Sequence, residues 1–208
     1  MSTDMFDDKA ATWDADPAKV ERARVVADAV RAAVPLDRST RLLEYGAGTG
    51  LVTQALRPHV GPVTLADTSA GMRAVVQSKI DAGTLPDARL WDVDLAVEPP
   101  PDELFDLVVT VMALHHIPEL DPVLSAFAAL LADGGHLCVV DLEEEDGSFH
   151  GDGFAGHRGF ARPALAARLL AAGFVDVSFR PCHHVVRDGA RYPLFLAVCR
   201  RGPGHRDG

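Results

Sequence analysis

The fold is decided by one stretch, Arg41-Leu42-Leu43-Glu44-Tyr45-Gly46-Ala47-Gly48-Thr49-Gly50, which joins an apolar run to three glycines at alternate positions. A helix-forming run, Leu51 to Leu56, follows directly. This pattern predicts a buried strand, a tight glycine turn and the start of a helix. Because glycine has no Cβ and tolerates positive φ, the backbone of such a turn can approach a ligand closely.

The spacing of the glycines separates this turn from other nucleotide-binding loops. A dinucleotide fingerprint requires G-x-G-x-x-G, and Gly46 and Gly48 match its first two positions. Leu51 stands where the third glycine should be, which speaks against an NAD-dependent oxidoreductase. No phosphate-binding lysine follows the turn, so the pattern is not a P-loop.

Composition indicates a single α/β domain of ordinary globular character. The chain has 208 residues, of which 48% are hydrophobic and 24% are charged. We expect a domain over residues 38–200, an N-terminal helical segment of the same domain over 1–37, and a disordered tail over 201–208. The net charge of -10 argues against a nucleic-acid partner, because phosphate binding needs clustered Lys and Arg.

The cysteines and the N-terminus favour a cytoplasmic protein. The three cysteines are scattered and form no C-x-x-C, so we expect buried thiols without a disulfide framework. Residues 1–8 are acidic and lack the pattern of a signal peptide, and no apolar run is long enough to cross a bilayer. We therefore expect no membrane partner.

Further elements follow from local signals. Asp16-Pro17 predicts the start of a helix that Pro35 ends, and Ala88–Val93 predicts a third strand. Residues 181–191 are expected to be irregular. Phe6 and Trp13 precede the helix that starts at Asp16-Pro17. They either pack on that helix or form part of a lid over a ligand.

Asp67 ends the second predicted strand, 63–66, about twenty residues beyond the first glycine. In an open parallel sheet that position faces the glycine turn, and a carboxylate can accept two hydrogen bonds from the hydroxyls of a ribose. We expect Asp67 to bind a ribose; the alternative is a helix N-cap.

Several segments together resemble the class I S-adenosylmethionine (SAM)-dependent methyltransferases, in particular the UbiE-like small-molecule enzymes. They are E-Y-G-A-G-T-G from Glu44, Asp67, Asp94, F-D-L-V-V-T-V-M-A-L-H-H-I from Phe105, and L-L-A-D-G-G-H-L from Leu130. The resemblance covers roughly residues 38–200. It implies a Rossmann-like α/β sandwich with helices on both faces of a mostly parallel seven-stranded sheet, whose last strand runs antiparallel between strands five and six.

The resemblance also implies transfer of a methyl group from SAM to an O or N nucleophile of a small-molecule acceptor, with S-adenosyl-L-homocysteine as the product. Glu44 and the glycine turn would hold the methionine end, and Asp67 and Asp94 the nucleoside. Asp92 competes with Asp94; we favour Asp94 because it comes last on the strand face that it shares with Leu90. The implied cofactor contacts are Glu44, Gly46, Gly48, Gly50, Asp67, Met72, Asp94, Leu95, Val111 and His115.

Histidines are the candidates for a catalytic base, since their ordinary pKa lies near neutrality. The first candidates are His150 and His157, which lie in a segment over 143–159 that is expected to be irregular, and the second candidates are His115 and His116. The alternative is that the loop histidines are simply exposed to solvent. We expect no metal, because the adjacent side chains of His115 and His116 should diverge and no ligand spacing is present.

A catalytically silent SAM-binding or partner-binding domain remains an alternative to the enzyme. The sequence leaves the oligomeric state open between monomer and homodimer.

Overall fold

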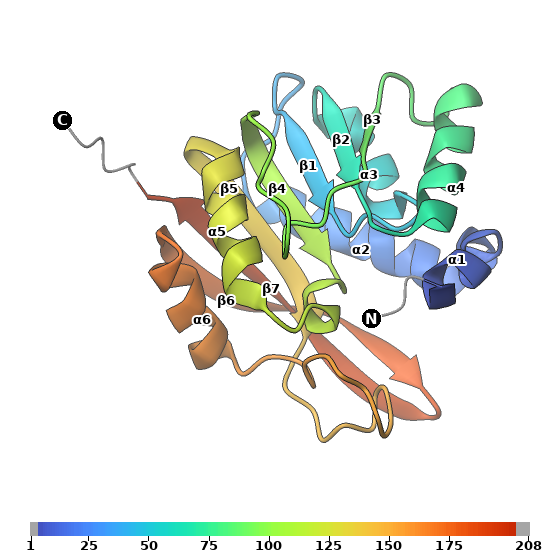
Figure 1. Ribbon diagram of the computed structural model, residues 1–208, viewed down its shortest axis with the longest axis vertical. Helices are drawn as coiled ribbons and strands as arrows, with labels where there is room; N and C mark the ends of the chain where they lie inside the picture. The colour runs from blue at the N-terminus through green and yellow to red at the C-terminus, as the bar shows by residue number, and fades with distance from the viewer. Residues whose placement is uncertain (1–3, 203–208) are drawn as a thin grey trace.

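The computed structural model describes residues 4–202 as one α/β unit built on a seven-stranded sheet (Figure 1). The strand order is β3-β2-β1-β4-β5-β7-β6. All neighbouring pairs from β3 to β5 are parallel, while β7 runs antiparallel to both β5 and β6. The expected fold class, including an antiparallel last strand between the fifth and sixth, is confirmed.

The strands are β1 Leu42–Tyr45, β2 Val63–Ala66, β3 Arg89–Trp91, β4 Phe105–Val111, β5 Leu131–Leu142, β6 Phe174–Arg187 and β7 Ala190–Arg201. The α-helices are α1 Asp4–Ala10, α2 Pro17–Ala33, α3 Leu51–Leu56, α4 Ala70–Asp81, α5 Leu120–Leu130 and α6 Arg162–Ala171. Three 3-10 turns are η1 Trp13–Ala15, η2 Arg57–His59 and η3 Leu114–His116.

Helices cover both faces of the sheet, and each face has its own apolar core. Successive residues of a strand point to opposite faces, so Leu42 enters the core beneath α2, α3 and α4, and Leu43 enters the core beneath α5 and α6. The central strands are buried on both sides and therefore read as nearly continuous apolar runs, as in other parallel sheets.

The expectation of an irregular segment over 181–191 is wrong. The segment is regular, because β6 and β7 form a long hairpin that turns at Asp188-Gly189, with φ of 52° and 80°. An Asp-Gly pair suits a tight hairpin turn, since both central residues need positive φ. Pro181 lies next to a register shift on the edge strand β6, and proline is tolerated at such positions.

Segment ends also differ from the expectations. The third strand is shorter than 88–93 and covers only Arg89–Trp91. Arg201 belongs to β7, and the Gly202 N–H donates to the carbonyl of Gly173 at 3.1 Å, so the expected tail does not begin at 201. The rest of that tail, 203–208, lies outside the described residues.

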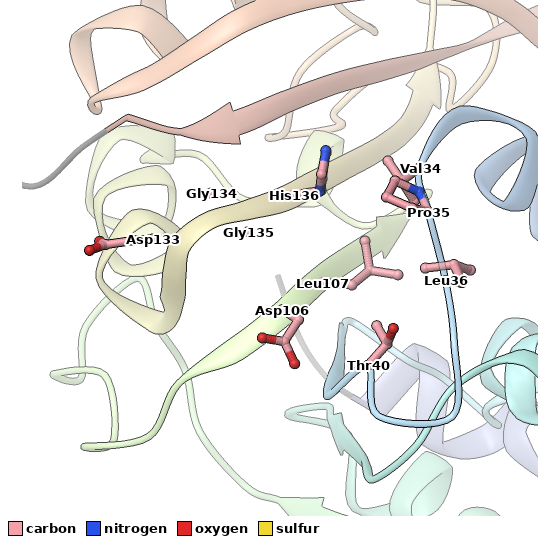
Figure 2. A pocket seen from close by; sticks show the side chains of 10 residues that line it. All are labelled: Val34, Pro35, Leu36, Thr40, Asp106, Leu107, Asp133, Gly134, Gly135 and His136. Atoms are coloured by element: carbon pink, nitrogen blue, oxygen red, sulfur yellow. The ribbon is translucent and has the colours of Figure 1, made fainter.

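The carboxyl ends of β1 to β5 meet at one edge of the sheet, and the segment between β5 and α6 and the tip of the β6–β7 hairpin extend beyond that same edge (Figure 1). The opposite edge carries a hollow of about 230 Å³ at the amino ends of β4 and β5, where Asp106 and His136 lie (Figure 2). Open α/β sheets bind ligands at the carboxyl ends, so this hollow is not the expected site.

Candidate functional site

The glycine turn after β1 has the backbone that its sequence predicts. Gly46, Gly48 and Gly50 have φ of 68°, 55° and 77°. The N–H groups of Gly46 and Ala47 donate to the carbonyl of Ala66 at the end of β2, at 2.9 and 3.0 Å. A Cβ added to Gly48 would meet only the Sδ of Met72, at 3.9 Å. The turn therefore keeps backbone free of side chains at Gly48, where a ligand can approach.

Asp67 joins this turn to the start of α4. One carboxylate oxygen accepts from the Gly48 N–H at 2.7 Å and the other from the Ser69 N–H at 2.9 Å. Ser69, not Asp67, caps α4 by accepting from the Met72 N–H, so the N-cap alternative for Asp67 is wrong. Burial raises the pKa of the Asp67 carboxyl, while the bonds from Ser69 and Gly48 oppose that shift.

Glu44 is turned away from the edge of the sheet and into the protein. Its carboxylate accepts from the N–H and the hydroxyl of Thr53 on α3, at 2.9 and 2.5 Å, and only 3% of the residue is exposed. The structure therefore places Glu44 as an anchor between β1 and α3. Direct contact with the methionine end of SAM stays a prediction.

Glu44 gives the stability of the fold a specific pH dependence. Burial raises its pKa to about 7, with the bonds from Thr53 opposing. The folded state keeps a proton that the unfolded chain releases, so this group lowers stability as the pH rises from about 4.5 to about 7. Each unit corresponds to about 1.4 kcal/mol, so Glu44→Gln should gain roughly 3 kcal/mol over wild type across that window. Urea unfolding of both proteins at pH 4.5 and pH 8 measures the difference; an unchanged difference would contradict the raised pKa.

The two competing aspartates after β3 differ in their contacts, and the binding of adenine by Asp94 stays a prediction. Asp92 is exposed and pairs with Arg73 of α4 at 2.8 Å. Asp94 is half-buried and lies beyond the end of β3, so the shared strand face that favoured it does not exist. Because Asp92 forms an ion pair with Arg73, Asp94 stays the preferred candidate for binding adenine. The Leu95 N–H donates to the hydroxyl of Tyr45 at 3.1 Å, a bond that an adenine ring would have to replace.

The backbone after β4 comes very close to the glycine turn. Val111 ends the strand, and Met112 follows with a φ of 55°, an uncommon conformation for a residue other than glycine. A Cβ on Gly46 would lie less than 3.0 Å from the Cβ of Ala113, closer than two such atoms can come. The first glycine is therefore required for close packing of two strand ends, in addition to its positive φ.

His115 and Asp141 form a buried pair at the ends of β4 and β5. His115 Nδ1 lies 2.6 Å from a carboxylate oxygen of Asp141, and the residues are 1% and 0% exposed. Asp141 also accepts from the N–H groups of Leu142 and His115, at 2.8 and 3.3 Å. A carboxylate can only accept, so Nδ1 carries a proton, and Nε2 is the ring nitrogen that Asp141 does not engage.

Two more histidines join His115. The ring centroids of His115 and His116 are 4.0 Å apart, and His150 lies 5.0 Å from His115 and 5.2 Å from His116. The expected divergence of the adjacent pair is wrong, because both residues lie in the η3 turn. We call His115, His116 and His150 the histidine cluster.

The segment that carries His150 is attached to the η3 turn through its backbone. The His157 N–H donates to the carbonyl of His115 at 2.7 Å, and His157 Nε2 lies 3.2 Å from the carbonyl of Pro118. Of the two histidines proposed as bases, the structure brings only His150 to the other histidines. No sequence signal predicted this gathering, since the residues come from segments far apart in the chain.

The N-terminal segment crosses the same edge of the sheet. Asp7 accepts from the Gly71 N–H at 2.8 Å, and Asp14 pairs with Lys79 at 2.6 Å and bonds to Thr49 of the glycine turn. Phe6 contacts His116 edge to face at 5.2 Å, whereas Trp13 lies under the ammonium of Lys19 in α2. Trp13 therefore packs beside α2, whereas Phe6 lies against His116; a lid role for Phe6 stays a prediction.

Comparison with known proteins agrees with this geometry. A family described as "Methyltransferase domain" matches residues 19–179. An uncharacterised methyltransferase of Schizosaccharomyces pombe is 33% identical over 60% of this chain and 49% of its own length. The ubiquinone/menaquinone biosynthesis C-methyltransferase UbiE of Stutzerimonas stutzeri is 31% identical over 50% of this chain and 42% of its own.

Solved structures show the same fold. The N-methyltransferase NodS from Bradyrhizobium japonicum, in complex with S-adenosyl-L-homocysteine, has a TM-score of 0.69 at 19% identity, covering 90% of this chain and 89% of that one. The chain spans about half the length of the first two curated relatives.

A glycine turn after the first strand, an acidic residue after the second and this strand order define a class I methyltransferase fold. The chain belongs to the methyltransferase-domain family, the SAM-dependent methyltransferases. The glycine turn fits such a cofactor, because the open approach at Gly48 lies directly beside Asp67. Within residues 4–202, no helix is long and apolar enough to span a membrane.

Proposed function

We propose that this protein transfers the methyl group of SAM to an oxygen or nitrogen of a small-molecule acceptor. The observation that carries the proposal is the meeting of three features at one edge of the sheet: the glycine turn, Asp67 and the histidine cluster, joined by the contact between Gly46 and Ala113. SAM supplies an electrophilic methyl group on a sulfonium leaving group, so the protein has mainly to bind, orient and exclude water.

In this proposal the cofactor side of the site is formed by β1, β2 and β3. The backbone at Gly48 approaches the cofactor, Asp67 accepts from the ribose hydroxyls, and Met72 packs against the adenosine. Asp94 and Leu95 bind the adenine, which requires Leu95 to exchange its bond with Tyr45. Val111 and His115 line the boundary with the acceptor side.

The acceptor side is formed by the histidine cluster and the segment 143–159. A neutral oxygen or nitrogen nucleophile loses a proton when it is methylated, and unprotonated imidazole nitrogens can accept that proton or hold the acceptor in place. His150 is the candidate for this role among the two histidines chosen from the sequence. Curated relatives carry names that include C-, O- and N-methyltransferases, and the polar lining of the histidine cluster favours an oxygen or nitrogen acceptor.

Phe6, Asp7 and Asp14 support a lid over this site. Asp7 and Asp14 attach the N-terminal segment to α4 and to the glycine turn, and Phe6 extends to His116. A segment held by a few polar contacts can open for ligand entry and close to keep water out during transfer.

Calorimetric titration with SAM, S-adenosyl-L-homocysteine and NAD tests the proposal. We expect micromolar binding of both adenosyl ligands, about -8 kcal/mol, and no binding of NAD. A screen of small hydroxyl and amine acceptors with SAM then measures S-adenosyl-L-homocysteine production. Binding of NAD alone would overturn the cofactor assignment, and SAM binding with no turnover on any acceptor class would favour the silent binding domain.

A further inference from the structure

We infer that His115, His116 and His150 form a binding site for one divalent transition-metal ion of the zinc class. The site lies at the carboxyl ends of β4 and β5, and the inference requires no particular acceptor. One ring nitrogen from each of the three histidines lies within 4.8 Å of the other two. Around a tetrahedral zinc ion with Zn–N distances of about 2.1 Å, ligand nitrogens are about 3.4 Å apart, so a modest rotation of the rings completes the set.

The strongest support is that each of these histidines keeps one buried ring nitrogen without a partner. They are Nε2 of His115, Nδ1 of His116 and Nδ1 of His150, and no group among the described residues forms a hydrogen bond with any of them. Buried polar atoms are nearly always satisfied, so a single orphan would call for an explanation. Three ring nitrogens without partners lie close together and come from two different segments. Their grouping indicates one shared partner to which all three can donate a lone pair, as they would to a metal ion.

The carboxylate beside His115 suits a cation. The bond from His115 Nδ1 to Asp141 does not engage Nε2, and metal-bound histidines are usually oriented by such a carboxylate. The fully buried carboxylate of Asp141 adds a compensating negative charge.

The surroundings are those of a built site. Phe154 stacks on His150 at 3.8 Å with an interplanar angle of 7°, Phe149 lies edge-on to His150 at 4.7 Å, and Phe6 covers His116. These rings place apolar surface against His116 and His150, both of which are partly exposed. Among the described residues, only these three imidazoles group as ligands, which leaves one position of a tetrahedral ion open, as in catalytic zinc sites. Zinc or another imidazole-binding divalent ion is therefore favoured over magnesium or calcium, which prefer oxygen ligands.

With the ion bound, the His150 nitrogen is a metal ligand and does not act as the proton acceptor proposed above. Where the proposed methyl transfer also holds, an ion here would lie on the acceptor side and favour a deprotonated acceptor oxygen.

The test uses the full chain without a polyhistidine tag, stripped with a chelator and dialysed. Titration with Zn²⁺ should show one equivalent bound per chain with submicromolar affinity, and Co²⁺ should produce the visible absorption bands of tetrahedral nitrogen-ligated cobalt. Zn²⁺ should also raise the melting temperature, because it binds the folded state. Less than half an equivalent of zinc together with octahedral-type cobalt spectra would overturn the site.

Variants separate the cluster from adventitious histidine binding. His116→Gln and His150→Gln should each lower zinc affinity at least 100-fold and abolish the tetrahedral cobalt spectrum. Asp141→Asn should lower affinity by about 10- to 100-fold as a positioning residue. His136→Gln, at the opposite edge of the sheet, is the matched control and should bind one equivalent like wild type. His150 lies in an irregular segment, so its variant tests the site even where a substitution in η3 disturbs folding.

Equal zinc binding by His150→Gln and wild type would exclude the cluster as the site. SAM titration of the stripped protein distinguishes this failure from failure of the proposed function. If zinc does not bind but SAM does, only the metal-site inference is wrong. If zinc binds but SAM does not, only the SAM assignment is wrong.

Discussion

Gly46→Ala should lower the free energy of unfolding by about 2–5 kcal/mol. A left-handed backbone costs a residue with a Cβ roughly 1–2 kcal/mol, and overpacking in a well-packed region costs about 1–3 kcal/mol more. Both costs apply here, because Gly46 has a φ of 68° and its added Cβ would lie less than 3.0 Å from the Cβ of Ala113. Urea denaturation of the variant and of wild type measures the loss.

Gly83→Ala is the matched control for the backbone cost. Gly83 has a φ of 74°, is exposed, and has no atom within 4 Å of the position that an added Cβ would take, so only about 1–2 kcal/mol should be lost. Adding Ala113→Gly to Gly46→Ala removes the clash, and the coupling energy of the pair should be about 1–3 kcal/mol. If Gly46→Ala and Gly83→Ala cost the same, the close approach of the two strand ends is not an energetic constraint.

Asp67→Asn should weaken binding of SAM and of S-adenosyl-L-homocysteine by about 10- to 100-fold, or roughly 1–3 kcal/mol. The substitution removes the charge from hydrogen bonds to ribose, and it also weakens the bonds from Gly48 and Ser69 that shape the turn. Calorimetric titration of the variant, with its melting temperature recorded, measures the effect.

Ser69→Ala separates the two contributions of Asp67. It removes the N-cap of α4 and leaves the carboxylate of Asp67 in place, so it should cost stability of about 1 kcal/mol with little change in SAM affinity. An equal loss of affinity in both variants would assign the effect to the position of α4. Unchanged affinity in Asp67→Asn would remove Asp67 from the ribose site.

Local patterns predicted the elements whose form depends on neighbouring residues in the chain. The helix over Leu51–Leu56, the N-cap at Asp16 and the three positive φ values of the glycine turn follow from residue type and spacing. The regular structure of residues 181–191 does have a local sequence signal. Asp188-Gly189 is a tight-turn pair between strand-forming residues, which is typical of a β-hairpin. The length of β6 depends on its pairing with β7, and a local sequence pattern does not predict that pairing.

Residue type and local spacing were enough to predict the fold class, the glycine turn and the acidic residue after the second strand, because strand periodicity and glycine stereochemistry act over a few residues. Local patterns could not predict that Glu44 anchors α3, that Phe6 lies on His116, or that His150 joins the pair in η3. These contacts link segments far apart in the chain, and they form only when packing of the whole sheet brings its carboxyl ends, the N-terminal segment and residues 143–159 together.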